Sequence, residues 1–97
     1  MRTLTHGDVA AAARAVLHLP REEWPGAVWR FLECAHAADL FRKRHGRNHP
    51  LWGNGSLSAA TPPNARLAPE PFLSELRYLE AMASVFDVLL DWRRREV

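Results

Sequence analysis

The chain has 97 residues, of which 47% are hydrophobic and 25% charged, and its formal net charge is +2. This length predicts one domain over residues 1–97, and the modest charge argues against a strongly basic nucleic-acid binder. The only cysteine, Cys34, excludes an intramolecular disulfide. No apolar stretch reaches the roughly 20 residues of a membrane span, and no secretion signal precedes the first helix. We therefore expect a soluble, cytoplasmic protein with no membrane contact.

The first predicted helix covers residues 6–19. Thr5 and Asp8 have the spacing of a capping box, in which each side chain satisfies a backbone N–H of the other residue. Pro20 ends the helix because it has no N–H to continue the ladder, and residues 21–24 form a connector. One face of the helix carries the apolar side chains Val9, Ala13, Val16 and Leu17.

A second helix is predicted over residues 25–45, with Pro25 suited to its first position. Its last turn is basic, which suits the negative end of the helix dipole, and Gly46 is suited to a left-handed cap. Apolar side chains recur every three or four residues and predict the buried face: Val28, Phe31, Leu32, Ala35, Ala38 and Phe41.

The following segment is rich in glycine, proline and asparagine, which favours specific turns. We expect Trp52 to anchor this loop and Ser56 to cap a short helix over residues 57–61. Residues 62–71 contain four prolines and predict an extended connector. The structured loop is predicted to consist of His49, Pro50, Trp52, Gly53, Gly55 and Ser56.

The last helix is predicted over residues 72–95. Phe72, Leu76, Leu79, Ala83, Phe86 and Leu90 alternate spacings of four and three, as in a coiled-coil heptad. The apolar face is wider than one helix of a small monomer needs, so part of it is predicted to contact a partner. Trp92 is either an interface residue or a plug at the helix end. The candidate interface comprises Phe72, Leu76, Leu79, Met82, Phe86, Leu89, Leu90 and Trp92.

No segment shows the alternation of a β-strand. The sequence therefore predicts an all-α fold with a short N-terminal helix and two long antiparallel helices. A Gly/Pro-rich loop containing the short helix joins the long pair.

Catalytic and metal sites are not indicated. Cys34, His36, His45 and His49 are candidate zinc ligands, but positions two apart on a helix point about 200° from each other. Ser56 lacks the pattern of a nucleophile elbow. We expect no enzyme activity, no catalytic residue, no metal and no cofactor.

Basic residues gather at two helix ends. One group is Arg42, Lys43, Arg44 and Arg47, close to Trp52, and the other is Arg93, Arg94 and Arg95. Two interpretations stand side by side: contacts to a phosphate backbone, or cations that complement the helix dipole. No recognition helix is evident, so DNA binding at these residues is expected to be weak and independent of sequence. At residues 53–56, a glycine turn with an N-cap serine is favoured over an anion site.

Three stretches together resemble a known family. They are residues 5–14, residues 35–44 and the segment His49-Pro50-Leu51-Trp52-Gly53-Asn54-Gly55-Ser56-Leu57, followed by Pro69-Glu70-Pro71-Phe72-Leu73. Together they resemble short alphaproteobacterial proteins encoded beside the DNA-packaging genes of gene transfer agents. That family is similar in role to phage small terminase subunits.

The resemblance implies a phage-like DNA-packaging role, in which a helical homo-oligomer, such as a ring, brings DNA to the large terminase subunit. Phage small terminases carry an N-terminal DNA-binding domain, and this chain has no room for one. The resemblance therefore implies packaging with little sequence choice. The alternative is a small helical adaptor or regulator that binds one protein partner through an apolar helix face.

Overall fold

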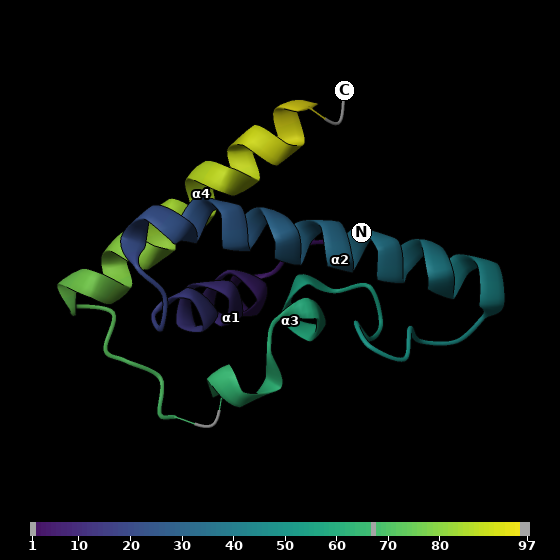
Figure 1. Cartoon of the computed structure of the whole chain (residues 1–97), viewed down its shortest axis with the longest axis horizontal. Coiled ribbons are helices and arrows are strands. Elements are labelled where there is room, and N and C mark those ends of the chain that lie inside the picture. Colours follow the sequence, from purple (N-terminus) through teal and green to yellow (C-terminus); the bar gives the residue numbers. More distant parts are fainter. Residues whose placement is uncertain (1, 67, 96–97) are drawn as a thin grey trace.

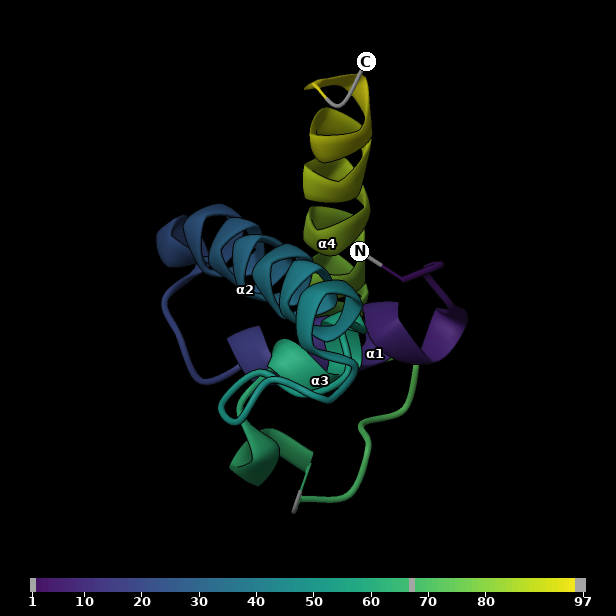
Figure 2. The same ribbon diagram turned by 90° about the vertical axis from the view of Figure 1, so that its right-hand side faces the viewer.

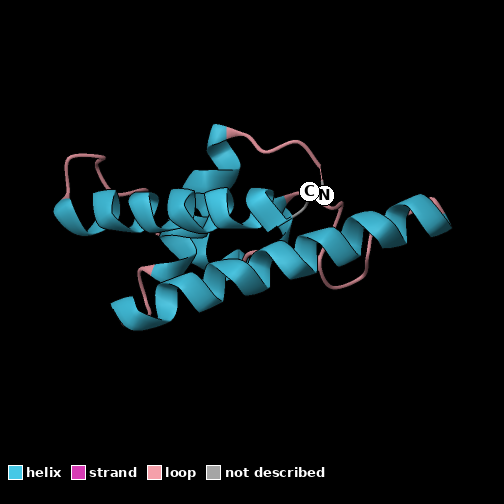
Figure 3. Cartoon of the chain, turned by 90° about the horizontal axis from the view of Figure 1, so that it is seen from above, coloured by secondary structure: helices cyan, strands magenta, loops and turns pink. Residues whose placement is uncertain are grey.

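The computed structural model describes residues 2–66 and 68–95, and helices make up its regular structure (Figure 1). Figure 3 shows these helices joined by loops; no strand is present in the described residues, and one isolated bridge pairs His49 with Gly53. The expected all-α fold with two long helices is confirmed. The helices are α1 (His6–Val16), α2 (Trp24–His45), α3 (Leu57–Ala60) and α4 (Leu76–Arg95), with 3-10 turns η1 (Arg21–Glu23) and η2 (Pro63–Arg66).

The predicted helix caps are present. The Thr5 hydroxyl accepts from the Asp8 backbone N–H, and the Asp8 carboxylate accepts from the Thr5 N–H at 3.0 Å. Gly46 ends α2 with φ 69° and donates its N–H to the Arg42 carbonyl. The Ser56 hydroxyl accepts from the Ala59 N–H at the start of α3. Local sequence signals therefore fix these helix ends, because each cap satisfies a backbone group that the helix leaves unpaired.

Four helix boundaries differ from expectation, two of them by a single residue, since α2 begins at Trp24 and α3 ends at Ala60. Helix α1 ends at Val16 instead of residue 19, because Pro20 disfavours helical backbone in the residue before it. Helix α4 begins at Leu76 instead of residue 72. The preceding residues form a turn in which Glu75 donates its N–H to the Phe72 carbonyl, and the Phe72 side chain is 79% exposed. No burial therefore stabilises an extra helical turn there.

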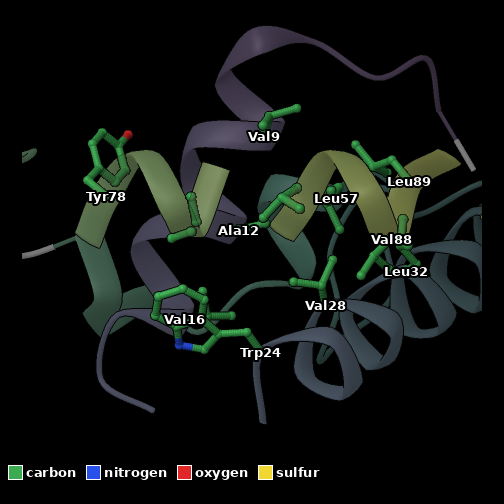
Figure 4. Close-up of a cluster of buried hydrophobic side chains, with 13 residues drawn as sticks. Val9, Ala12, Val16, Trp24, Val28, Leu32, Leu57, Tyr78, Val88 and Leu89 are labelled. Atoms are coloured by element: carbon green, nitrogen blue, oxygen red, sulfur yellow. The ribbon is translucent and has the colours of Figure 1, made fainter. Parts of the chain in front are cut away.

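Helix α1 lies at the centre of the fold and is buried on most of its circumference, rather than on the single face expected. Its alanines allow neighbouring helices to approach closely, and α4, α3, η2 and α2 all pack against it. Figure 4 shows the resulting cluster, in which side chains of all four α-helices meet. The core consists of Val9, Ala12, Ala13, Val16, Trp24, Val28, Leu32, Leu57, Tyr78, Ala81, Val85, Val88 and Leu89.

The expected antiparallel pairing of the two long helices is wrong. The first residue of α2, Trp24, contacts Arg77 near the start of α4, and His36 further along α2 contacts Trp92 near the end of α4. Both helices therefore run in the same general sense, and in Figure 1 both begin on the left. Short loops favour antiparallel neighbours, whereas the long connection through α3 and η2 brings the chain back before α4 begins. The central α1 runs opposite to both.

Residues 1, 67, 96 and 97 of the predicted domain lie outside the described residues. Across residues 2–66 and 68–95, no helix combines the length and the apolar character needed to cross a membrane.

Candidate functional site

The second half of α2 extends to the right of the other helices in Figure 1 and carries the first basic group at its end. We call Arg42, Lys43, Arg44 and Arg47 the basic tip. Two of its cations pair with Asp39, whose carboxylate lies 3.1 Å from Lys43 Nζ and 3.4 Å from an Arg42 amino group. Within the described residues, the carboxylate contacts of the tip involve Arg42 and Lys43, while Arg44 and Arg47 are exposed and make none. Four cations and one carboxylate leave the tip with a net charge of +3, and two of its cations, Arg44 and Arg47, contact no carboxylate among the described residues.

Aromatic rings form a row beside these cations. The ring centroids lie 4.4 Å apart for His45 and Phe41, 5.0 Å for Phe41 and His49, and 4.5 Å for His49 and Trp52. The last two rings are stacked, and the Arg47 guanidinium lies 5.9 Å from the Phe41 centroid. An open depression of about 500 Å³ borders the row and is lined by Ala37, Leu40, Phe41, Arg44, His45 and His49. Phe41, His49 and Trp52 are half-buried and His45 is exposed, and cations beside partly accessible aromatic rings suit nucleic-acid backbone and bases.

The predicted structured loop is held by contacts with its own residues and with α2. His49 and Gly53 exchange two backbone hydrogen bonds of 2.8 and 3.1 Å, and the His49 ring nitrogen Nδ1 accepts from the Leu51 and Trp52 N–H groups. Gly53 and Gly55 have φ values of 76° and 93°, which favour glycine. The loop therefore fixes the His49 and Trp52 rings of the aromatic row.

The candidate interface of α4 divides into two parts. Leu89 is 7% exposed and belongs to the core, while Met82 and Trp92 are half-buried against it. Leu89 is therefore removed from the candidate interface. Trp92 contacts Trp29 at a centroid distance of 4.9 Å, which supports the helix-end plug over the interface residue. Exposed apolar side chains remain at Phe72, Leu76, Leu79, Phe86 and Leu90.

The fold does not place the second basic group close to the basic tip. Arg93, Arg94 and Arg95 lie at the end of α4, which diverges from the basic tip in Figure 1. Arg95 is also engaged, by Asp91 at 3.3 Å and by the Trp29 ring at 5.1 Å. The Arg95 guanidinium is therefore engaged by its own chain, through a carboxylate and an aromatic ring.

Comparison with known protein families gives a match that covers most of the chain. A model for a domain of unknown function, DUF7742, matches residues 2–89. The chain belongs to the DUF7742 family. No curated protein and no solved structure matches it.

The DUF7742 match spans α1, the basic tip, the structured loop and α4 as far as Leu89. Arg93, Arg94 and Arg95 lie beyond the matched residues. The basic tip and the loop therefore both lie within the matched residues.

Sequence reasoning did not identify Asp39 as part of the basic site. It is 2% exposed and lies against the loop, where a Cβ on Gly55 would come within 2.8 Å of the Asp39 Cβ. Its position four residues before Lys43 is the usual spacing of a helical ion pair, and this signal was available. The carboxylate lowers the net charge of the tip, and the Asp39 residue packs against Gly55 of the loop.

Titratable groups elsewhere form no comparable cluster. Across the described residues, no three His, Cys, Asp or Glu side chains are arranged to hold a metal ion. Burial raises the pKa of the half-buried Cys34 thiol, and the Glu33 carboxylate raises it further. A thiol with a raised pKa is a weak nucleophile at neutral pH.

Proposed function

We propose that this chain is a non-catalytic, small-terminase-like subunit of a DNA-packaging machine, of the kind used by gene transfer agents. In this proposal it self-associates and presents DNA to a large terminase subunit with little sequence preference. It acts in the cytoplasm without cofactor, metal or membrane.

The observation that carries the proposal is the separation of two surfaces on one small chain. The exposed apolar side chains of α4 lie on one long helix, and the basic tip lies at the end of the other. An apolar helix face supports assembly, and unneutralised cations beside aromatic rings support contact with a phosphate backbone. The arrangement suits a subunit that is held in an assembly while it touches DNA.

The chemistry of the basic tip sets the expected affinity. Arg44 and Arg47 offer charge and planar guanidinium groups, and the row of rings beside them accepts stacking by any base. Attraction to the phosphate backbone and stacking on a base do not depend on the base sequence. We therefore expect a dissociation constant of about 10⁻⁵ M for random-sequence DNA at physiological salt.

Replacement of both Arg44 and Arg47 by alanine should weaken DNA binding equally on unrelated sequences. Loss of two phosphate contacts should make the slope of log affinity against log salt concentration shallower by about 2, at roughly 0.9 per contact. Fluorescence anisotropy of labelled duplexes over a series of salt concentrations measures both quantities.

The matched control removes two cations elsewhere, by Arg2→Ala and Arg30→Ala. Both side chains are exposed and neither belongs to the basic tip; Arg30 lies earlier in α2, and the Arg2 backbone N–H donates to the Gly55 carbonyl of the loop. This control loses the same charge and should change the salt slope much less. Equal slopes for the two double variants would mean that the basic tip makes no specific contribution to DNA binding.

Light scattering coupled to size-exclusion chromatography tests the assembly part. At tens of micromolar the protein should be larger than a monomer, because burying the exposed apolar side chains of α4 favours association. A strict monomer with no DNA affinity would support the adaptor or regulator instead. A pull-down with this protein as bait separates the two hypotheses further. Recovery of a packaging ATPase would support the proposal, and recovery of another partner would support the adaptor.

A further inference from the structure

The depression beside the basic tip lies between the end of α2 and the structured loop. Phe41, His45 and His49 all line it, so part of each ring is accessible from the depression. Its volume of about 500 Å³ is in the range of small-molecule sites, roughly 300–1,000 Å³. Figure 2 looks at this side of the molecule: the end of α2 faces the viewer, the loop lies beneath it, and the later half of α4 points away. Because the depression is open, a flat group that is joined to a longer chain can enter it.

Contacts within the chain leave only part of the aromatic row available to a ligand. Trp52 stacks on His49 with 8° between the ring planes, so it covers one face of that imidazole. The Arg47 guanidinium lies over the Phe41 ring. His45, in the last turn of α2, is exposed and borders the depression. A ligand in the depression therefore meets the His45 ring and the accessible parts of Phe41 and His49.

The hydrogen bonds of the loop determine which nitrogen of the His49 ring carries the proton. Nδ1 accepts from the Leu51 and Trp52 N–H groups at 3.0 and 3.1 Å, so Nδ1 is unprotonated. The neutral imidazole then carries its proton on Nε2. Among the described residues, Nε2 has no hydrogen-bond partner, and it is not one of the buried polar atoms. The loop therefore holds an available N–H donor at the edge of the depression.

The charges around the depression are predominantly positive. Arg44 lines it, and Arg47 lies beside it over the Phe41 ring. Residues 40–69 contain no acidic side chain, and Asp39 is 2% exposed. The next acid along α2 is Glu33, eleven residues before Arg44 and therefore about 16 Å away along the helix axis. The chemistry that complements the depression is therefore a flat ring attached to an anionic chain.

We infer that the depression binds an unpaired nucleotide of a DNA strand, an inference that rests on the DNA contact proposed above. The base stacks against the His45 ring, and an acceptor atom of the base meets the His49 N–H. The phosphates on either side of this nucleotide pair with Arg44 and Arg47. Every base has a flat face and at least one acceptor atom, so the site accepts any of the four.

A duplex can use the cations of this site but not the depression. Its bases are stacked on their neighbours, and moving one out of the stack costs free energy. The cations favour the duplex slightly, because its salt slope is about 0.9 per phosphate contact against about 0.7 for a single strand. For two contacts at about 0.15 M salt, this difference amounts to about twofold. Stacking of one base favours the single strand by about five- to 150-fold. The single strand should therefore bind about tenfold more tightly.

Fluorescence anisotropy of the full-length protein tests this preference. The probes are a labelled mixed-sequence DNA strand without self-complementarity and the duplex made from that strand. At physiological salt, about tenfold tighter binding of the single strand is expected. Equal or tighter binding of the duplex would overturn the inference and leave the proposed DNA contact intact. Binding of neither probe would overturn both. Tighter binding of an RNA strand of the same sequence would overturn the assignment to DNA.

His45→Ala removes the exposed ring from the site. It should weaken single-strand binding about fivefold and leave duplex binding within about twofold of wild type. The salt slope should stay unchanged, because stacking releases no counterions. His18→Ala is the matched control, since His18 is also an exposed histidine but does not line the depression. Equal effects of the two variants on single-strand binding would overturn the site.

His49→Asn tests the ring that the loop holds. An asparagine side chain retains an acceptor for the Leu51 and Trp52 N–H groups and is common in turns, so the loop should be preserved. The variant should lose most of the preference for the single strand, while its circular dichroism matches wild type. An unchanged preference in the folded variant would overturn the role of His49. Where His49→Asn does not fold, the comparison of His45→Ala with His18→Ala decides the inference by itself.

Discussion

Replacement of Gly55 by alanine is expected to destabilise the protein by about 3 kcal/mol or more. Gly55 has φ 93°, which side chains rarely adopt, and an added Cβ would lie 2.8 Å from the Asp39 Cβ and 2.9 Å from its Cα. The close atoms are backbone and β-carbon of α2, so no flexible side chain can move away. The free energy of unfolding, measured by urea denaturation with circular dichroism, gives the effect.

Two other glycines serve as controls for this variant. Gly46 also has a positive φ, of 69°, but no atom lies within 4 Å of an added Cβ. Gly46→Ala should therefore cost only about 1 kcal/mol, from backbone strain alone. Gly26 lies in α2 with open space around it, and Gly26→Ala should stabilise the protein by about 0.5 kcal/mol. Similar costs for Gly55→Ala and Gly46→Ala would contradict the close approach of the loop to Asp39.

Replacement of Trp24 by alanine is expected to cost about 3–5 kcal/mol, the usual range for a buried large aromatic side chain. Trp24 is 3% exposed, and its indole N–H donates to the Leu19 carbonyl at 3.0 Å. The Arg77 guanidinium lies 5.0 Å from the ring and also donates to the Leu17 and Leu19 carbonyls. Trp24 therefore joins the end of α1, the start of α2 and the start of α4.

Trp24→Phe is the matched variant, because it retains most of the ring and removes the indole N–H. Its expected cost is about 1–2 kcal/mol, since the Leu19 carbonyl still accepts from Arg77. For a domain of this size, 1 kcal/mol corresponds to about 4–8 °C in Tm. Thermal unfolding should rank wild type, Trp24→Phe and Trp24→Ala in that order. An alanine variant as stable as the phenylalanine variant would exclude a central packing role for this ring.

The helix ends were predictable because their causes are local. Each cap acts on backbone groups within a few residues of itself. The Thr5–Asp8 capping box begins α1, Ser56 begins α3, and Gly46 ends α2. The buried face of α2 was also predictable, since the spacing of its apolar residues leaves one choice of face. Asp8 shows the limit of such reasoning, because its carboxylate also accepts from the Ser58 N–H of α3, fifty residues away.

The candidate site was predictable in composition but not in arrangement. The basic and aromatic residues near the end of α2 are close in sequence, so their proximity in space follows from helix geometry. The pairing of Asp39 with Lys43 follows from their spacing on α2, whereas the burial of Asp39 against Gly55 depends on how the loop folds back on the helix. The separation of Arg93–Arg95 from the tip depends on how the two long helices cross.

By itself, the sequence determined the presence of the four helices and the caps at Thr5, Gly46 and Ser56, because each cap depends on residues a few positions apart. Only the tertiary structure decided the direction of α4 and which of its two apolar faces is buried. Both faces of α4 have helical spacing, and the choice between them depends on the alanine-rich α1, which accepts Ala81 and Val85 closely. The side that α1 leaves uncovered carries Leu76, Leu79, Phe86 and Leu90, and their exposure supports the assembly role proposed for this chain.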